Sequence, residues 1–266
     1  MKLTLVPYAG LCNRMNAIMS ALALQNKTNI KTSIFWEKTK DCCAWYDELF
    51  EPIPSLQINR LQHYYLKPSS KKNLFLPSLL RLFLFDKTYK GIAISNKTLL
   101  MDGEDLGNVY VSSFNRFCPL CETEKLGRFF IPLPHIKKLI DDIICQYGIR
   151  TVGIHIRRTD NVAAIKNSPV ELFYKEMDEE IRENPDVTFF LATDNDCLKT
   201  EIKNRYGARI ITYNSSLNRY SLEGMIDAVV ELWCLATCKK IIGSSNSTYS
   251  SVASKLFGNP IYIVAN

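Results

Sequence analysis

The sequence lacks any run of about 18 consecutive apolar residues, the length that a transmembrane helix needs. It also lacks the features of a secretory signal, because residues 1–7 resemble a strand that leads directly into a loop. Its nine cysteines are odd in number and have no framework spacing, which is typical of reduced thiols. These absences predict a cytoplasmic protein without a membrane span or disulfides.

Concentrated positive charge is missing as well. The net charge of +6 is spread along the chain, so the composition does not indicate a nucleic-acid-binding protein. A single Cys-x-x-Cys pattern, residues 118–121, has no second pair at zinc-finger distance and does not predict a metal site. With 47% hydrophobic and 23% charged residues over 266 positions, the chain has the composition of a soluble globular protein of one or two domains.

The second half of the sequence alternates regularly between strand and helix patterns. Strands are predicted near 151–156, 187–192, 209–213, 240–243 and 260–265. Helices are predicted near 169–183, 196–206, 221–238 and 248–257, with Ser168 as N-cap before Pro169 and with Asp194, Asn195 or Asp196 as cap of the next helix. Such alternation predicts a doubly wound parallel sheet with helices on both faces.

The first half opens with a strand near 3–6, a loop, a helix near 15–25 and a strand near 33–36. Gly10 is expected to let the backbone turn sharply, so that Asn13 and Arg14 lie at the helix N-terminus, where N–H groups favour an anion. The alternative for Asn13 is a simple N-cap. Between residues 40 and 112 only strands near 92–95 and 109–112 are predicted, without a topology. A helix over 135–147 leads into the second half.

We therefore predict an α/β protein with an N-terminal domain over residues 1–134, a C-terminal domain over 135–266, and a cleft between them.

One segment stands apart from this pattern. Residues 67–85 combine a basic flank with an apolar run, a combination that can dock on an anionic membrane surface or on a lipid-linked substrate. A core-facing helix is the alternative reading, since most such runs are core.

The strongest functional signal is the stretch His155-Ile156-Arg157-Arg158-Thr159-Asp160, which follows an apolar strand pattern. In an open α/β sheet, ligands bind outside the carboxyl ends of the strands. Two adjacent guanidinium groups there suit phosphate oxygens. The alternative is a surface network of ion pairs.

Two further polar stretches end predicted strands of the second half. Asp194 and Asn195 follow one strand and can bind the edge of a purine or a ribose. The hydroxyl-rich turn after the next strand leads into a helix and can hold a phosphate through Ser245, Ser247 and Thr248. Together, the three strand ends predict a nucleotide-diphosphate site.

Four motifs together resemble those of a known family. Gly10-Leu11-Cys12-Asn13-Arg14, the stretch 155–160, Ala192-Thr193-Asp194-Asn195 and residues 245–250 are similar, in order and spacing, to motifs of the GDP-fucose-dependent fucosyltransferase superfamily. The resemblance covers most of the chain. It implies a GT-B-like fold of two Rossmann-like domains facing a cleft, an inverting mechanism and no metal or other cofactor. It also implies a GDP-sugar donor held mainly by the second domain and an acceptor held mainly by the first. We expect the acceptor to be a glycan or a lipid-linked oligosaccharide.

The same resemblance implies roles for individual residues. Arg157 and Arg158 would contact the donor diphosphate, with His155 and either Asp194 or Asn195 near the guanine and the ribose. Phosphate contacts would come from Ser245, Ser247 and Thr248, while Asn13 and Arg14 would lie beside the sugar or its diphosphate. Arginines aimed at the leaving diphosphate lower the barrier to transfer, a task that a divalent metal performs in other transferases.

The sequence departs from the family pattern at the general base. In the α-1,6 members a glutamate a few residues past the Arg-Arg pair is a proposed base, but residues 161–166 contain no carboxylate. We therefore predict Asp160 as base, with Glu171 next; the alternative role of Asp160 is to orient an arginine through an ion pair. Two other functions stay open: a metal-dependent transferase using the Asp-x-Asp pattern at residues 194–196, and a nucleotide- or glycan-binding protein without catalytic activity.

Overall fold

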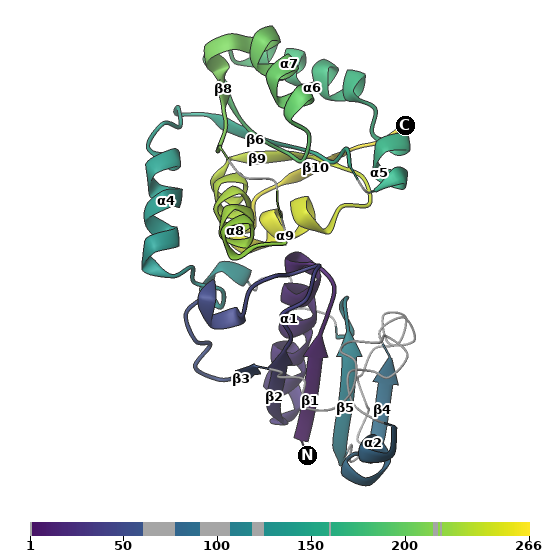
Figure 1. The fold of residues 1–266 in the computed structure, drawn as a ribbon. Helices are drawn as coiled ribbons and strands as arrows, with labels where there is room; N and C mark the ends of the chain where they lie inside the picture. Colours follow the sequence, from purple (N-terminus) through teal and green to yellow (C-terminus); the bar gives the residue numbers. More distant parts are fainter. Residues whose placement is uncertain are drawn as a thin grey trace. The chain divides into compact units, whose positions relative to one another are not determined.

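The structure is a computed structural model, and it describes residues 2–60, 78–90, 107–118, 125–159, 161–214, 218 and 220–266. The chain divides into two compact units, residues 1–124 and 125–266. Each unit contains one five-stranded sheet, and every strand pairing within the two sheets is parallel (Figure 1). Two Rossmann-like α/β units are thus present, as predicted.

The sheet of the first unit has the strand order β3-β2-β1-β5-β4. Its strands are β1 (Lys2–Pro7), β2 (Lys31–Trp36), β3 (Gln57–Arg60), β4 (Lys87–Lys90) and β5 (Asn108–Ser113). The chain moves outward from the central β1 through β2 to β3 and then crosses to the other side, so the order of the strands reverses between β1 and β5. That reversal is a topological switch point, where open α/β sheets bind ligands.

Two helices and one short 3-10 helix belong to the described part of this unit: α1 (Leu11–Thr28), η1 (Tyr46–Glu48) and α2 (Ser78–Leu84). Helix α1 is longer at both ends than the predicted 15–25. It begins after Gly10 and ends where Asn29 adopts a left-handed conformation with φ of 56°. The strand predicted near 109–112 is β5, whereas the one near 92–95 lies outside the described residues.

The sheet of the second unit has the order β10-β9-β6-β7-β8. Its strands are β6 (Thr151–Ile156), β7 (Thr188–Thr193), β8 (Ile210–Ile211), β9 (Lys240–Ser244) and β10 (Ile261–Val264). Its helices are η2 (Leu126–Arg128), α4 (Pro134–Ile144), α5 (Val162–Asn167), α6 (Val170–Glu183), α7 (Asp196–Tyr206), η3 (Gly207–Arg209), α8 (Leu222–Thr237) and α9 (Thr248–Phe257). The switch point here lies between β6 and β9.

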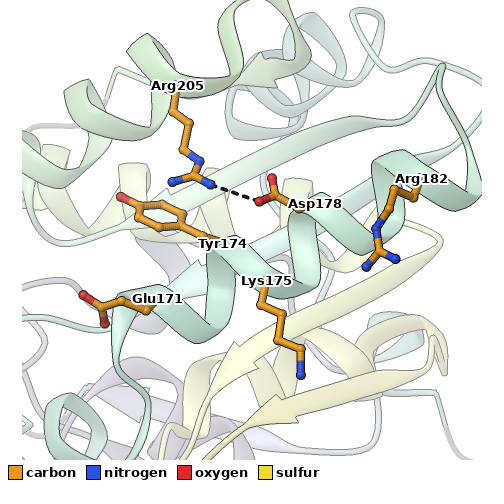
Figure 2. A pocket seen from close by; sticks show the side chains of 6 residues that line it. All are labelled: Glu171, Tyr174, Lys175, Asp178, Arg182 and Arg205. Carbon is orange, nitrogen blue, oxygen red and sulfur yellow. Dashed lines mark hydrogen bonds and ion pairs between the residues drawn. The ribbon is translucent and has the colours of Figure 1, made fainter.

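Helices α6 and α7 cover one face of this sheet, and α8 and α9 cover the other (Figure 1). The outer surfaces of α6 and α7 form a cavity of about 470 Å³, lined by Glu171, Tyr174, Lys175, Asp178, Arg182 and Arg205 (Figure 2). Within it, Nη2 of Arg205 lies 2.9 Å from a carboxylate oxygen of Asp178, and its guanidinium lies 4.4 Å from the centre of the Tyr174 ring. The charges of Arg205 and Asp178 are therefore paired within the protein.

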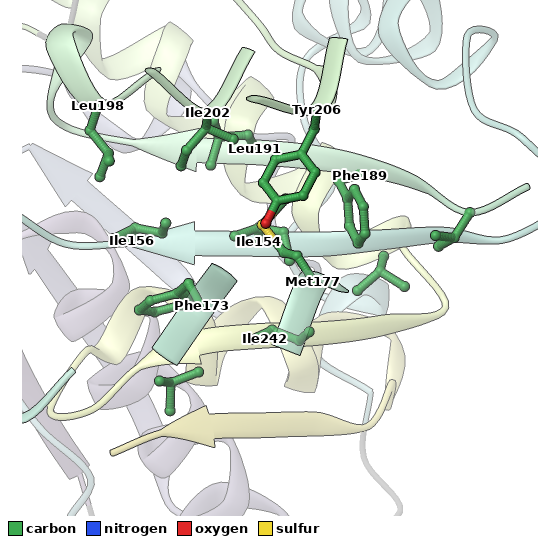
Figure 3. Packing of buried hydrophobic residues seen from close by; sticks show 13 residues of the cluster. Ile154, Ile156, Phe173, Met177, Phe189, Leu191, Leu198, Ile202, Tyr206 and Ile242 are labelled. Atoms are coloured by element: carbon green, nitrogen blue, oxygen red, sulfur yellow. The ribbon is translucent and has the colours of Figure 1, made fainter. Parts of the chain in front are cut away.

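Beneath α6 and α7, a continuous apolar cluster fills the space to the sheet (Figure 3). Phe173 and Met177 of α6 are fully buried, as are Ile154 of β6 and Leu191 of β7. Fully burying a side chain of this kind contributes about 1.5–3 kcal/mol. This core fixes the strands whose carboxyl ends carry the polar motifs.

The predicted strands and helices of the second half are all present within a few residues of their predicted bounds. The six-residue helix α5 was not predicted. The predicted cap of α6 is wrong, because Pro169 itself is the N-cap and the helix begins at Val170. Ser168 instead ends α5, and its buried hydroxyl donates to the carbonyl oxygen of Val264.

Ion pairs stabilise the amino-terminal edge of the second sheet, which is opposite to the carboxyl edge that carries the polar motifs. The carboxylate of Glu180 in α6, only 4% exposed, lies 2.7 Å from Nζ of Lys240 and 3.0 Å from Nη2 of Arg150. Lys240 begins β9, and Arg150 immediately precedes β6. Glu180 therefore connects the starts of the two central strands, and both cations neutralise its buried charge.

Candidate functional site

Three loops meet at the carboxyl edge of the second sheet. They follow β6, β7 and β9, whose strand ends are adjacent in the register: Ile156 pairs with Thr193, and His155 pairs with Gly243. The predicted polar stretches of the second half therefore lie side by side at the switch point. This position is where a doubly wound sheet binds its ligand.

Asp194 is the hub that connects the loop after β6 to the loop after β7. Its Oδ1 accepts a hydrogen bond from the main-chain N–H of Arg158 at 2.7 Å. Its Oδ2 accepts from the hydroxyl of Thr159 at 2.6 Å and lies 3.1 Å from Nε of Arg157. Both carboxylate oxygens of Asp194 thus fix the conformation of the loop and the direction of the Arg157 side chain.

Arg158 points toward helix α5. Its Nη2 donates to the carbonyl of Ser168 at 2.7 Å and its Nη1 to the carbonyl of Ile165 at 3.5 Å. Burial lowers the pKa of this guanidinium, while the nearby Glu171 and Asp194 oppose that shift. Arg158 therefore holds the last turn of α5, and its predicted contact with a diphosphate stays a prediction.

His155 lies beneath these loops, 5% exposed, and its ring stacks on Tyr249 of α9 at 4.9 Å between centroids. Burial and then the charge of Arg157 lower its pKa to about 4, against the opposing effect of Asp194. The imidazole is therefore neutral at pH 7. Its Nδ1 is buried and has no hydrogen-bond partner in the described structure, so this atom can accept or donate a hydrogen bond to a ligand.

Two hydrogen bonds hold the loop after β9 in place. Ser244 accepts the main-chain N–H of Arg157 at 3.0 Å, and the main-chain N–H of Ser245 donates to the hydroxyl of Ser168 at 2.8 Å. A side chain on Gly243 would lie 2.6 Å from Cβ of Ser250, so only glycine lets α9 approach β9 this closely. Helix α9 begins directly after this loop, and the N-terminus of a helix favours an anion.

Several polar atoms at this edge are buried and have no partner among the described residues. Besides His155 Nδ1 they are Thr193 Oγ1, Ser245 Oγ, Ser250 Oγ and Arg158 Nε. A buried polar atom without a partner costs about 1–3 kcal/mol. Such atoms gathered at one strand edge indicate a site that a polar ligand completes.

Most of the remaining predicted site residues of this unit lie at the starts of helices. Asn195 is the N-cap of α7 through its side-chain oxygen, as predicted. Ser247 is the N-cap residue of α9 and Thr248 is its first residue. Asp160 lies outside the described residues, and Glu171, in the first turn of α6, lines the cavity of Figure 2.

Asn13 and Arg14 belong to the first unit, in the first turn of α1. The expected role of Gly10 is wrong: Gly10 is extended with φ of −69°, and Ala9 makes the turn with φ of 66°. Nδ2 of Asn13 donates to the carbonyl of Phe114 at 3.0 Å, which joins the first turn of α1 to the loop after β5.

Arg14 is fully buried. Its Nε donates to the carbonyl of Ala9 at 2.8 Å, Nη1 to that of Glu37, and Nη2 to the hydroxyl of Thr39 at 2.9 Å. The guanidinium also lies 4.8 Å from the centre of the Trp36 ring. Arg14 therefore stabilises the turn at Ala9 and the loop after β2 from inside the unit.

Sequence reasoning missed three residues that shape these edges. Ser168 is predicted only as a helix cap, Ser244 belongs to the predicted hydroxyl-rich turn but receives no role there, and Arg116, after β5, has no predicted role. The first two are fully buried hydroxyl groups, and a serine at the end of an apolar strand is a signal for such a role only once the neighbouring strand is known.

No group of three or more metal-ligating side chains is present in the part of the chain that the structure describes. Both oxygens of Asp194 accept hydrogen bonds, and Asp196 lies exposed in the first turn of α7. Within the same residues, no helix is long and apolar enough to cross a membrane.

Comparison with solved structures identifies the fold. The chain is similar to the fucosyltransferase NodZ from Bradyrhizobium, with a TM-score of 0.65 and 14% identity over 96% of this chain and 93% of that chain. The chain has the fold of the fucosyltransferases. Similarity extends to Arabidopsis thaliana FUT1 in complex with GDP, with a TM-score of 0.60 and 17% identity over 98% of this chain and 69% of that one.

POFUT1 in complex with GDP is a third structure with this fucosyltransferase fold, with a TM-score of 0.59 and 10% identity over 99% and 98% of the two chains. No protein-family model matches the sequence, and no curated protein matches it. At these identities, the shared feature is the GT-B-like fold of two Rossmann-like units.

Proposed function

We propose that this chain is a glycosyltransferase that moves fucose from GDP-fucose to a glycan hydroxyl, with inversion at the anomeric carbon and without a metal ion. The observation that carries the proposal is the hub at Asp194, which fixes Arg157 at the switch point of the second sheet. The fold supports it, since NodZ has been solved after soaking with GDP-fucose and POFUT1 in complex with GDP.

The donor is assigned to the second domain, residues 135–266, and the acceptor to the first, residues 1–134. Arg157 is the principal contact of the diphosphate, assisted by Ser245, Ser247, Thr248 and the first turn of α9. His155, Asn195 and the loop that Asp194 organises form the side of the site that receives the guanosine. Arg158 supports the diphosphate site through α5, and Asn13 faces the sugar while Arg14 positions its loop.

In the reaction, the acceptor oxygen forms a bond to the anomeric carbon of fucose. The bond from that carbon to the β-phosphate oxygen breaks, and its electron pair leaves with GDP. Negative charge grows on the diphosphate, and a preorganised guanidinium at Arg157 lowers the barrier by several kcal/mol. The acceptor proton goes to a carboxylate, for which Asp160 is the first candidate and Glu171 the second.

Binding of GDP-fucose, measured by calorimetry in excess EDTA against GDP-mannose and UDP-galactose, tests the proposal. We expect binding that prefers GDP-fucose, ignores EDTA and is lost in Arg157→Ala. Binding that requires a divalent cation would favour the Asp-x-Asp alternative. Binding without transfer to any member of a broad acceptor panel would favour a non-catalytic protein. For the base, an Asp160→Asn variant with normal turnover and an unchanged pH profile would contradict the assignment to Asp160.

A cytoplasmic location and a peripheral membrane contact through residues 67–85 complete the proposal, with a lipid-linked oligosaccharide as acceptor. Helix α2 supports the contact, because its apolar side chains Leu79, Leu82 and Phe83 are 70%, 77% and 84% exposed. Residues 67–77, with three lysines, lie outside the described residues. Cosedimentation with anionic but not with neutral liposomes is expected, and it should be lost when Leu82 and Phe83 are replaced by serine.

A further inference from the structure

The loops at the switch point of the first sheet contain an arginine whose charge no described residue compensates. Arg116 lies in the loop after β5, where the order of the strands reverses between β5 and β1. Its Nε donates to Oδ1 of the buried Asn16 at 3.4 Å, and its Nη2 is buried with no hydrogen-bond partner. This long hydrogen bond is the one described contact of the guanidinium.

The guanidinium is half-buried, and burial lowers its pKa. No carboxylate of the described residues lies close enough to oppose that shift. A partly desolvated cation without a counter-ion is costly, and proteins almost always pair such a charge. By contrast, the exposed Arg60 of the same unit has a carboxylate partner in Asp47 at 2.9 Å. An anion from outside the chain would supply the acceptors that the described residues do not offer to Arg116.

Two aromatic residues of the loops at this switch point indicate what carries that anion. The rings of Tyr8, after β1, and Phe114, after β5, lie 5.3 Å apart at a tilt of 57°, and both side chains are partly exposed. Asn13, in the first turn of α1, donates to the carbonyl of Phe114 and joins the helix to the loop after β5. Aromatic rings beside a few polar groups are suited to the apolar face and the hydroxyl groups of a sugar ring.

We propose that Arg116 binds a carboxylate or phosphate group of the acceptor glycan, beside the rings of Tyr8 and Phe114, so that the enzyme selects acidic acceptors. That the anion belongs to an acceptor substrate rests on the proposed function. The anion site itself is a property of the first unit alone. It makes Arg116 a residue that determines specificity and gives it no part in bond breaking.

The first test is stability without ligand. If Arg116 is a ligand-binding residue, Arg116→Gln should leave the melting temperature unchanged or raise it, because the variant removes a desolvated charge without a partner. A fall in melting temperature of several degrees would indicate a structural arginine and would contradict the proposal. Arg116→Lys keeps the charge, and Arg60→Gln makes the same charge change at an exposed site of the same unit.

The second test measures binding of glucuronate and glucose 6-phosphate, against glucose at equal ionic strength and without GDP, by calorimetry or ligand-detected NMR. The wild type should prefer at least one of the two acidic sugars over glucose by about tenfold or more. That preference should vanish in Arg116→Gln, persist in part in Arg116→Lys and stay intact in Arg60→Gln. No preference in the wild type, or the same preference in Arg116→Gln, would overturn the proposal.

GDP binding by the same variants separates this inference from the proposed function. Arg116→Gln should bind GDP within about twofold of the wild type. A tenfold loss would mean that the donor diphosphate is the anion at Arg116, and the acceptor assignment would be wrong. Failure of the wild type to bind GDP would contradict the proposed function. The experiment with the acidic sugars would still decide whether Arg116 forms an anion site.

Discussion

The carboxylate of Asp194 and the guanidinium of Arg157 form an ion pair at 3.1 Å across the ends of two neighbouring strands. The same carboxylate accepts the main-chain N–H of Arg158 at 2.7 Å. Asp194 therefore sets both the path of the loop and the direction of its first arginine. It is a positioning residue, since its oxygens contact the protein at the point where a ligand would bind.

Replacement of Asp194 by asparagine should lower the affinity for GDP by about ten- to a hundredfold, because the amide cannot hold Arg157 by charge and accepts fewer of the loop's hydrogen bonds. Calorimetry checks this outcome. Asp196→Asn is the matched control, two residues away on the same helix start, and should change the affinity by less than about twofold. Equal losses in the two variants would support the Asp-x-Asp reading instead.

The two adjacent arginines should differ in what they contribute. Arg157→Ala should lose GDP affinity by about a hundredfold or more with little change in stability, since its guanidinium is assigned to the diphosphate. Arg158→Ala should lower the free energy of unfolding by about 1–3 kcal/mol, because two carbonyls at the end of α5 lose a charged donor. Denaturant unfolding and calorimetry on both variants measure the contrast. Loss of GDP affinity at unchanged stability in Arg158→Ala would show that Arg158 contacts the ligand directly.

Gly243→Ala should destabilise the second unit by about 1–3 kcal/mol, since its new methyl group would lie 2.6 Å from Cβ of Ser250 and push α9 away from β9. GDP affinity should fall as well, because the first turn of α9 moves. Gly10→Ala is the control: Gly10 has an extended backbone, and an added Cβ has its nearest neighbours at 3.9 Å. Thermal and denaturant unfolding of the pair test the prediction, which fails if Gly243→Ala is as stable as Gly10→Ala.

His155 should make stability depend on pH. Its pKa is about 4 in the folded protein and 6.5 in the unfolded chain, so between these values the unfolded state binds more protons. The contribution is complete above pH 6.5 and is lost as the pH falls toward 4, by up to about 3 kcal/mol.

Denaturant unfolding at pH 7 and pH 4.5 should therefore show a smaller loss of stability for His155→Gln than for the wild type. His135→Gln, at an exposed position of α4, should behave like the wild type. Parallel losses in the wild type and in His155→Gln would contradict the assignment of this pH dependence to His155.

The second sheet could be predicted because its strands are short apolar runs separated by amphipathic helices. Residues 151–156, for example, are buried throughout in the structure, as their apolar pattern predicts. Helix α5 escaped prediction because tertiary contacts hold it: Asn161 caps its start and donates to the carbonyl of Asn246, while Arg158 holds its end. Neither contact can be seen in a six-residue window of sequence.

The candidate site was predictable as a set of strand ends but not in the direction of each side chain. The sequence identifies an Arg-Arg pair, yet the pairing of Arg157 with Asp194 and of Arg158 with main-chain carbonyls depends on which strands are neighbours. The turn before α1 illustrates the same limit, since the left-handed residue is Ala9 although Gly10 stands beside it. Buried contacts of Arg14 with three carbonyl or hydroxyl groups stabilise that choice.

The ion pairs of Glu180 with Lys240 and Arg150 lie at the amino-terminal edge of the second sheet. The buried polar atoms of this unit that have no partner among the described residues gather at its carboxyl edge. The ion pairs at the amino-terminal edge thus anchor the strands, and the polar atoms at the carboxyl edge can form hydrogen bonds with a ligand. Substitutions that raise the stability of the folded state can therefore be made at the amino-terminal edge, which is remote from the ligand site. The carboxyl margin, where specificity would be redesigned, can then absorb the destabilising changes that a new ligand demands.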